Sequence, residues 1–167
     1  MRIFVIEAIV LCLTFHFCIY LVIRFKPELE IYSYPPAITQ RWIDLGKVRA
    51  KETPSLRVRL TKKIPAAILL GLLLGLLLWK INGCTGFLSA FLTGYGLWLI
   101  VDWYDALVMD CLWFCHSPTC ILPGTEDMTK AYHDYAFHLK SSAIGMLIGL
   151  PVCLLAALAV KLFVLLF

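Results

Sequence analysis

The sequence predicts an all-α fold, a polytopic membrane protein built as a bundle of four transmembrane helices with short interfacial helices on the cytoplasmic side. Of its 167 residues, 61% are hydrophobic and 16% are charged, whereas soluble domains contain about 45–50% apolar and roughly 25% charged residues. Four stretches are long and apolar enough to cross a hydrocarbon core of about 30 Å. This length suits one membrane domain covering residues 1–167.

The four predicted spans cover approximately residues 3–23, 64–81, 86–108 and 142–160. Each must be helical, because the lipid interior offers no water to unpaired backbone groups. The first span could be mistaken for a secretion signal. It contains Glu7 and no small-residue cleavage site follows it, so we expect an uncleaved anchor.

The basic residues predict the orientation. The loop at 24–63 contains ten Lys and Arg residues, whereas the segment at 80–85, where the second span ends and the next connection follows, contains only Lys80. The positive-inside rule places the long loop in the cytoplasm. We therefore expect a multi-pass protein of the cell membrane with both termini outside and with the loops at 24–63 and 115–141 in the cytoplasm.

The long loop contains two patterns of its own. Pro36 can begin a helix, and Ile38, Trp42 and Leu45 follow at helical spacing before Gly46 can end it. This is typical of a short amphipathic helix in the membrane interface, and the alternative is a plain connector.

A basic cluster precedes the second span. It indicates either binding of anionic lipid headgroups or only the setting of topology. Membrane lipids are thus the expected partners, and no nucleic-acid motif or separate soluble domain is present. The candidate lipid-binding residues are Arg57, Arg59, Lys62 and Lys63.

Two pairs of glycines lie four residues apart, Gly71 with Gly75 and Gly145 with Gly149. Such pairs let two helix backbones approach closely. They indicate either a homo-oligomer interface or a contact between the second and fourth helices within one chain.

Three carboxylates follow one another at the end of the third span: Asp102, Asp105 and Asp110. On an α-helix they spread over about 140° and face one side, close to the cytoplasmic boundary. Like charges repel, and the negative end of the helix dipole adds to the repulsion. We therefore expect them to face water or a positive partner such as a metal, a lysine or a protonated histidine.

A second polar segment follows. Thr125 is expected to cap a helix that has Glu126 near its positive end and continues through His133, Asp134 and His138. Asp134 and His138 are four residues apart, so this carboxylate can orient the imidazole. His133 points about 140° away from His138 on the same helix.

If that helix folds under the third span, carboxylates and imidazoles meet, and this ligand set suits Zn, Mn or non-haem Fe. The leading hypothesis is a metal-dependent enzyme acting on a lipid or other amphiphile, in which the metal activates water or polarises a phosphate. The alternatives are a proton- or cation-handling transporter and a non-catalytic scaffold with a salt-bridged lid. No complete catalytic motif is present. The candidate metal ligands are Asp102, Asp105, Asp110, His133 and His138, and the candidate catalytic residues are Glu126, His133 and Asp134.

Several motifs in the C-terminal half form a combination: Trp103–Asp110, Phe114–Cys115, Pro123–Glu126 and Tyr132–His138, with Tyr34–Pro36 as a weaker addition. Together they resemble a group of small multi-pass bacterial membrane proteins of unassigned function. The resemblance implies a membrane location and no particular activity.

Overall fold

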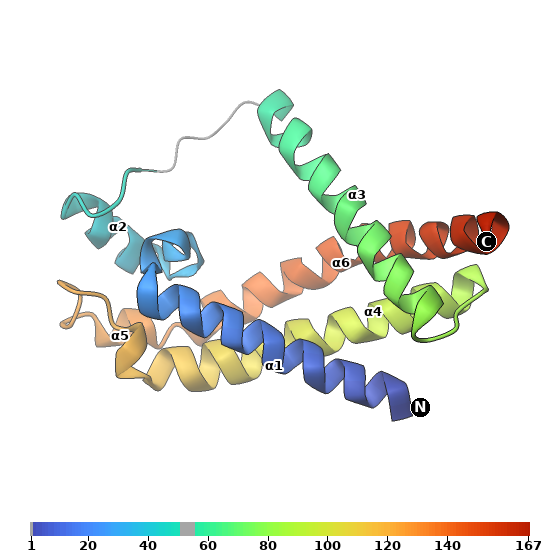
Figure 1. The fold of residues 1–167 in the computed structure, drawn as a ribbon. Helices are drawn as coiled ribbons and strands as arrows, with labels where there is room; N and C mark the ends of the chain where they lie inside the picture. Colours follow the sequence, from blue (N-terminus) through green and yellow to red (C-terminus); the bar gives the residue numbers. More distant parts are fainter. Residues whose placement is uncertain (1, 51–55) are drawn as a thin grey trace. The chain divides into compact units, whose positions relative to one another are not determined.

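The computed structural model describes residues 2–50 and 56–167, and for 56–60 and Lys62 it describes the backbone alone. The described residues form helices and short connections without a strand, which confirms the all-α class (Figure 1). The α-helices are α1 (Arg2–Phe25), α2 (Pro36–Asp44), α3 (Leu56–Lys80), α4 (Phe87–Tyr104), α5 (Thr129–Tyr132) and α6 (Tyr135–Leu166). The shorter elements are the 3₁₀ turns η1 (Pro27–Leu29), η2 (Ile31–Ser33) and η4 (Pro118–Cys120) and the π-helix η3 (Asp105–Phe114).

Three helical segments are long and apolar enough to cross a membrane: Arg2–Phe25, Lys63–Lys80 and Thr129–Leu166. Most of their side chains are not buried inside the protein. Exposed apolar surfaces of this extent are typical of a membrane location. The predicted span at 86–108 is not in this set. In that region α4 ends at Tyr104, and η3 follows it directly.

The chain divides into two compact units. Unit 1 contains Met1–Val10, Thr53–Asp102 and Ile144–Phe167, and unit 2 contains Leu11–Glu52 and Trp103–Ala143. The helices α1, α4 and α6 each contribute residues to both units.

In unit 1, α3 approaches α6 closely through its two glycines. A Cβ added to Gly71 would lie 2.8 Å from the Leu155 Cβ. A Cβ added to Gly75 would lie 2.8 Å from the Ala156 carbonyl oxygen and 2.7 Å from the Ala159 Cβ. Only glycine fits such a contact, so this pair of glycines is used within one chain. A homo-oligomer stays a prediction.

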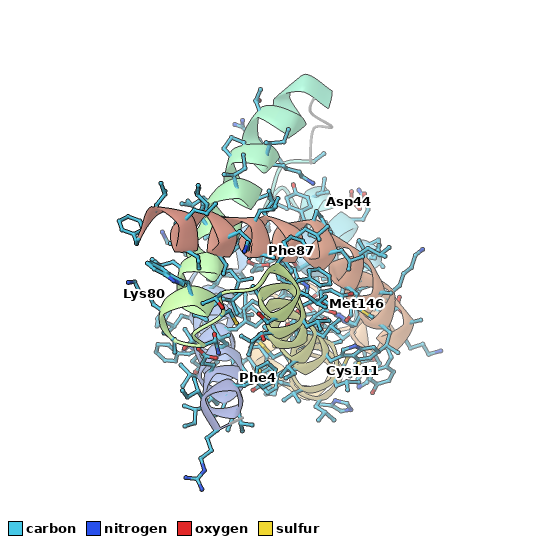
Figure 2. The ribbon with its side chains drawn as sticks, turned by 90° about the vertical axis from the view of Figure 1, so that its right-hand side faces the viewer. Phe4, Asp44, Lys80, Phe87, Cys111 and Met146 are labelled. Carbon is cyan, nitrogen blue, oxygen red and sulfur yellow. The ribbon has the colours of Figure 1, made fainter. Side chains whose placement is uncertain are left out.

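The other two glycines of unit 1 face α4. The Trp98 indole nitrogen donates to the Gly145 carbonyl oxygen over 3.1 Å, and a Cβ on Gly149 would overlap the same indole. At the other end of this unit, Figure 2 shows Lys80 at the end of α3 and Phe87 at the start of α4. Between them, Asn82 donates to the Glu7 carboxylate over 2.6 Å.

Unit 2 has an apolar core formed by the end of α1, the η1–η2 segment, α2 and the segment from η3 to α5. The predicted helix around Trp42 is confirmed as α2, which begins at Pro36 and is followed by Gly46 with φ of 66°. Ile38 and Trp42 are buried, and the Trp42 indole donates to the Pro123 carbonyl oxygen over 3.2 Å. The Trp42 hydrogen bond joins α2 to the loop between η4 and α5.

Candidate functional site

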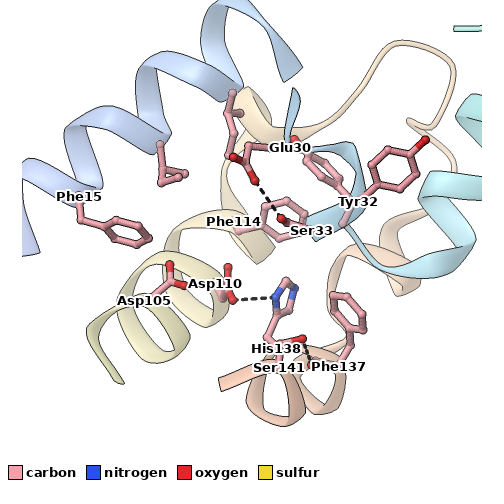
Figure 3. A pocket seen from close by; sticks show the side chains of 13 residues that line it. Phe15, Glu30, Tyr32, Ser33, Asp105, Asp110, Phe114, Phe137, His138 and Ser141 are labelled. Carbon is pink, nitrogen blue, oxygen red and sulfur yellow. Dashed lines mark hydrogen bonds and ion pairs between the residues drawn. The ribbon is translucent and has the colours of Figure 1, made fainter. Parts of the chain in front are cut away.

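The π-helix η3 places Asp105 and Asp110 on one face. In an α-helix, residues five apart differ by about 140° around the axis. A π-helix closes its hydrogen bonds between residues five apart, so such residues lie nearly in line. The backbone N–H of Cys115 accordingly donates to the Asp110 carbonyl oxygen. The predicted α-helical spread of the carboxylates is therefore wrong from Asp105 onward, and both aspartates line one pocket (Figure 3).

The second polar segment is two helices rather than the predicted one. α5 ends at Tyr132, and α6 begins at Tyr135. The Asp134 carboxylate accepts a hydrogen bond from the Phe137 backbone N–H over 3.0 Å. Asp134 therefore caps α6, because the first amides of a helix otherwise lack partners. Its predicted role in orienting His138 is wrong.

Thr125 also differs from the prediction, since it does not cap a helix. Its hydroxyl donates to the Leu122 carbonyl oxygen over 2.8 Å and lies 2.6 Å from the Tyr132 hydroxyl. The Tyr132 hydroxyl in turn accepts from the Leu122 backbone N–H over 2.9 Å. The side chain that the sequence assigns to a helix end instead ties a loop to α5.

The partner of His138 is Asp110. The imidazole Nδ1 lies 3.0 Å from the Asp110 carboxylate, and the His138 side chain is 2% exposed against 27% for Asp110. The rings of Phe114 and Phe137 lie against the imidazole with centroids 5.1 Å and 5.3 Å away. A carboxylate in this position fixes the ring orientation and favours a proton on Nδ1.

The other ring nitrogen of His138 is unsatisfied. Nε2 is buried and has no hydrogen-bond partner among the described residues. A buried polar atom without a partner costs about 1–3 kcal/mol. When Nδ1 donates to Asp110, the neutral ring keeps a lone pair on Nε2, so this atom is ready to accept a proton or a hydrogen bond.

Asp105, Asp110 and His138 line a pocket of about 320 Å³, which is named the unit 2 pocket (Figure 3). Small-molecule sites commonly measure about 300–1,000 Å³. α1 contributes an apolar wall, and the η1–η2 segment contributes Glu30 and Ser33, whose hydroxyl donates to Glu30 over 2.9 Å. The described residues that line the pocket include three carboxylates and no Lys or Arg.

Glu30 is a pocket residue that the sequence reasoning missed. Nothing in its neighbourhood marks it, because it lies in a basic loop far along the chain from Asp105. It reaches the pocket because Ile31 and Tyr34 are buried in the unit 2 core, which holds the turn between η1 and η2 in place. The Tyr34 hydroxyl also donates to the Cys120 carbonyl oxygen over 3.2 Å.

Two of the candidate catalytic residues lie in a second pocket of about 190 Å³, which Cys115, His116, Glu126 and His133 help to line. The His116 and His133 rings meet edge to face with centroids 5.1 Å apart. Both Glu126 oxygens accept from the Gly124 backbone N–H, and backbone hydrogen bonds lower the Glu126 pKa. Burial raises the pKa of the Cys115 thiol to about 11.

The remaining candidates are not among the residues that line the pocket of Asp105, Asp110 and His138. Asp102 belongs to unit 1, where a Cβ on Gly145 would overlap its carboxylate. Lys63 is exposed, and the side chains of Arg57, Arg59 and Lys62 lie outside the described residues. Within the part of the chain that the structure describes, no group of three or more His, Cys, Asp or Glu is arranged to hold a metal ion.

Comparisons with known proteins found no relative. No family model matches the chain, and neither a curated protein nor a solved structure matches it.

Proposed function

We propose that the chain is a multi-pass membrane enzyme that acts on a lipid or other amphiphile, with the Asp110–His138 pair as its acid–base group. The observation that supports this most strongly is the buried imidazole beside a pocket, with one nitrogen bonded to a carboxylate and the other unused. A buried carboxylate–imidazole pair in a pocket is a common arrangement for general acid–base catalysis.

The proposed chemistry assigns a role to each nitrogen. Nε2 takes a proton from a hydroxyl or a water molecule in the pocket, and Asp110 stabilises the imidazolium through Nδ1–H. Such proton transfer contributes about 10²–10⁴-fold to a rate. The apolar side chains Phe15, Ile19 and Phe137 line the same pocket and would contact the hydrocarbon part of an amphiphile.

A divalent metal in this pocket is part of the proposal. Asp105 and Asp110 are the members of the predicted ligand set that line it together with His138. Carboxylate and imidazole ligands suit Zn, Mn or Fe, and a metal there would polarise a bound phosphate or activate water.

The proposed membrane arrangement has four crossings. To the three apolar segments it adds residues 86–108 as a fourth, with both termini outside and the loops at 24–63 and 115–141 in the cytoplasm. The excess of Lys and Arg in the loop at 24–63 supports this orientation. The exposed Lys63, together with its neighbours Arg57, Arg59 and Lys62, would then lie beside anionic headgroups.

The experiment uses the purified protein in lipid nanodiscs with a total membrane lipid extract, followed over time by mass spectrometry. We expect one lipid class to be converted by the wild type and by His116→Gln, the control at the second pocket. His138→Gln should slow conversion by about 100-fold or more, and Asp110→Asn by about tenfold or more.

The same experiment separates the alternatives. Conversion that stops with a chelator and returns with Zn, Mn or Fe would support the metal. Conversion that is unchanged in His138→Gln would refute the acid–base role. Proton or cation flux in liposomes without lipid conversion would favour a transporter, an alternative supported by the three carboxylates of the pocket. Loss of thermal stability alone would favour a scaffold.

A further inference from the structure

Unit 1 contains a polar pair that takes no part in the proposed function. Glu7 belongs to α1, and Asn82 belongs to the connection between α3 and α4. The Asn82 side-chain amide donates to the Glu7 carboxyl group over 2.6 Å. This bond is shorter than the ordinary N–H···O length of about 2.9–3.0 Å, and such shortening is typical of a charged acceptor. The contact therefore indicates that Glu7 is a carboxylate.

Each member of this pair has one oxygen atom that lacks a partner. Glu7 Oε1 and Asn82 Oδ1 are both buried, and neither has a hydrogen-bond partner among the described residues. A carboxylate oxygen and an amide oxygen accept hydrogen bonds but donate none, so these two atoms cannot satisfy each other. Buried polar atoms are normally satisfied. The two oxygens therefore require a positive or hydrogen-bond-donating occupant.

Basic side chains do not supply the positive charge. Within the part of the chain that the structure describes, the ion pairs do not include Glu7. The Lys80 ammonium, close to Asn82 in the sequence, lies 3.7 Å from the centroid of the Trp79 ring. A buried charge without a partner is costly, and a bound cation would remove that cost.

The local structure holds the two side chains near helix ends. Glu7 lies in the second turn of α1. The turn that contains Asn82 is held by the Cys84 backbone N–H, which donates to the Leu78 carbonyl oxygen over 3.0 Å. Gly83 follows with φ of 65° and is exposed, so this connection borders solvent. An ion can therefore reach the pair from water.

We propose that Glu7 Oε1 and Asn82 Oδ1 bind a hard metal cation, Ca²⁺ or Na⁺. Hard cations prefer carboxylate and amide oxygens, and backbone carbonyls or waters complete their coordination. The site has a single carboxylate, so we expect the weak Ca²⁺ affinity of extracellular modules, with Kd of about 10⁻⁴–10⁻³ M. The bound ion would tie α1 to the connection between α3 and α4. This inference is independent of the proposed function, because neither residue lines the unit 2 pocket.

The test follows thermal unfolding of the full chain in zwitterionic nanodiscs by tryptophan fluorescence. CaCl₂ or NaCl replaces choline chloride at constant ionic strength, and calorimetric titration with Ca²⁺ measures binding directly. The variants are Glu7→Gln and Asn82→Asp. Glu28→Gln is the matched control, because Glu28 is an exposed glutamate outside unit 1.

We expect Ca²⁺ or Na⁺ to raise the wild-type unfolding midpoint in a saturable way, since a ligand of the folded state stabilises it. Glu7→Gln should lose this response. Without the cation it should be at least as stable as the wild type, because the new amide can donate to Asn82 Oδ1. Asn82→Asp should be less stable without the cation and respond more strongly to Ca²⁺, because two carboxylates then repel each other. Glu28→Gln should respond as the wild type does.

Three results would overturn the inference. The first is a wild type that responds to neither ion in a saturable way. The second is a response that is unchanged in both Glu7→Gln and Asn82→Asp. The third is an infrared band of a protonated carboxyl group that is present in the wild type and absent in Glu7→Gln, because a proton would then satisfy both oxygens. Lipid conversion in the His138 variants tests the proposed function separately.

Discussion

At the scale of single residues, hydrogen bonds among Leu122, Thr125 and Tyr132 hold the loop after η4 in place. Thr125 is fully buried and Tyr132 is 3% exposed. The Tyr132 hydroxyl bonds both the Thr125 hydroxyl and the Leu122 backbone N–H. Because water cannot replace these contacts, we expect Tyr132→Phe to lower the free energy of unfolding by about 1–3 kcal/mol.

This change is measured by chemical unfolding in detergent, followed by tryptophan fluorescence. Tyr32→Phe is the control, since the Tyr32 hydroxyl donates to the Arg49 carbonyl oxygen from an exposed position. Its effect should stay within about 0.5 kcal/mol. Equal effects of the two substitutions would contradict the importance of the buried group.

The buried thiol of Cys120 makes stability depend on alkaline pH. Burial raises its pKa from the ordinary value of 9.0 to about 12, and burial also raises the pKa of Tyr34. The folded protein therefore holds these protons more tightly than the unfolded chain. The resulting stability is fully present below the unfolded thiol pKa and is lost as the pH rises from about 9 toward 12.

We expect the free energy of unfolding to fall between pH 9 and 11, with Cys120 contributing up to about 1.4 kcal/mol per pH unit. Unfolding curves at several pH values for the wild type and for Cys120→Ala measure this contribution. The variant should be less stable at pH 8 and show a shallower decline above pH 9. An identical decline in both proteins would refute the role of Cys120.

At the scale of the elements, η3 decides which carboxylates share the unit 2 pocket. Removing Leu107, an exposed residue of η3, would leave Asp105 and Asp110 four positions apart, which keeps them on one face if the segment becomes α-helical. Inserting an alanine after Leu107 would instead rotate Asp110 away from His138. We expect the deletion to keep the Asp110–His138 pair and the insertion to break it, at a cost of about 1–3 kcal/mol.

The ¹⁵N resonances of His138 in the two variants measure this difference, with the unfolding midpoint as a second readout. In the ordinary α-helix that the sequence predicts, the deletion and the insertion would each rotate Asp110 by about 100°, and the pair would be lost in both variants. A deletion as harmful as the insertion would therefore contradict the π-helical structure.

Two of the helices show when a local sequence pattern predicts the structure correctly and when it does not. Proline at its start and apolar residues at helical spacing were enough to predict α2, because both act within a single turn. The prediction of a single helix through His133 is wrong because another local interaction interrupts that helix. Asp134 can bond a nearby backbone amide, and this cap separates α5 from α6.

At the scale of the whole molecule, the proposed membrane arrangement predicts which loops are accessible from outside the cell. We expect an epitope tag inserted after Thr85 to be reached by antibody in intact cells. A tag after Glu126 should be reached only after permeabilisation, because the proposed span at 86–108 lies between the two sites. Both sites are exposed, so the tags should not disturb the fold.

Access to both tags in intact cells would mean that 86–108 does not cross, and only the three apolar segments would remain as spans. Access to neither tag without permeabilisation would contradict the proposed orientation. A tag in the basic loop at 24–63, inserted after the exposed Lys47, is the internal reference for the cytoplasmic side.

The sequence by itself determined the helical class, the apolar segments and the position of α2. These features depend on hydrophobic length and on signals from neighbouring residues, which are local. It also singled out Asp105, Asp110 and His138, but only as part of a larger candidate set that included Asp102, Glu126, His133 and Asp134.

Only the tertiary structure decided which of these residues meet. It paired His138 with Asp110 rather than Asp134, moved His133 and Glu126 to a second pocket, and added Glu30. Each of these outcomes depends on side chains far apart in the sequence, and on a helix type that differs from the α-helix by one hydrogen-bond step. Such contacts follow from how the core of unit 2 packs, and no local pattern encodes them.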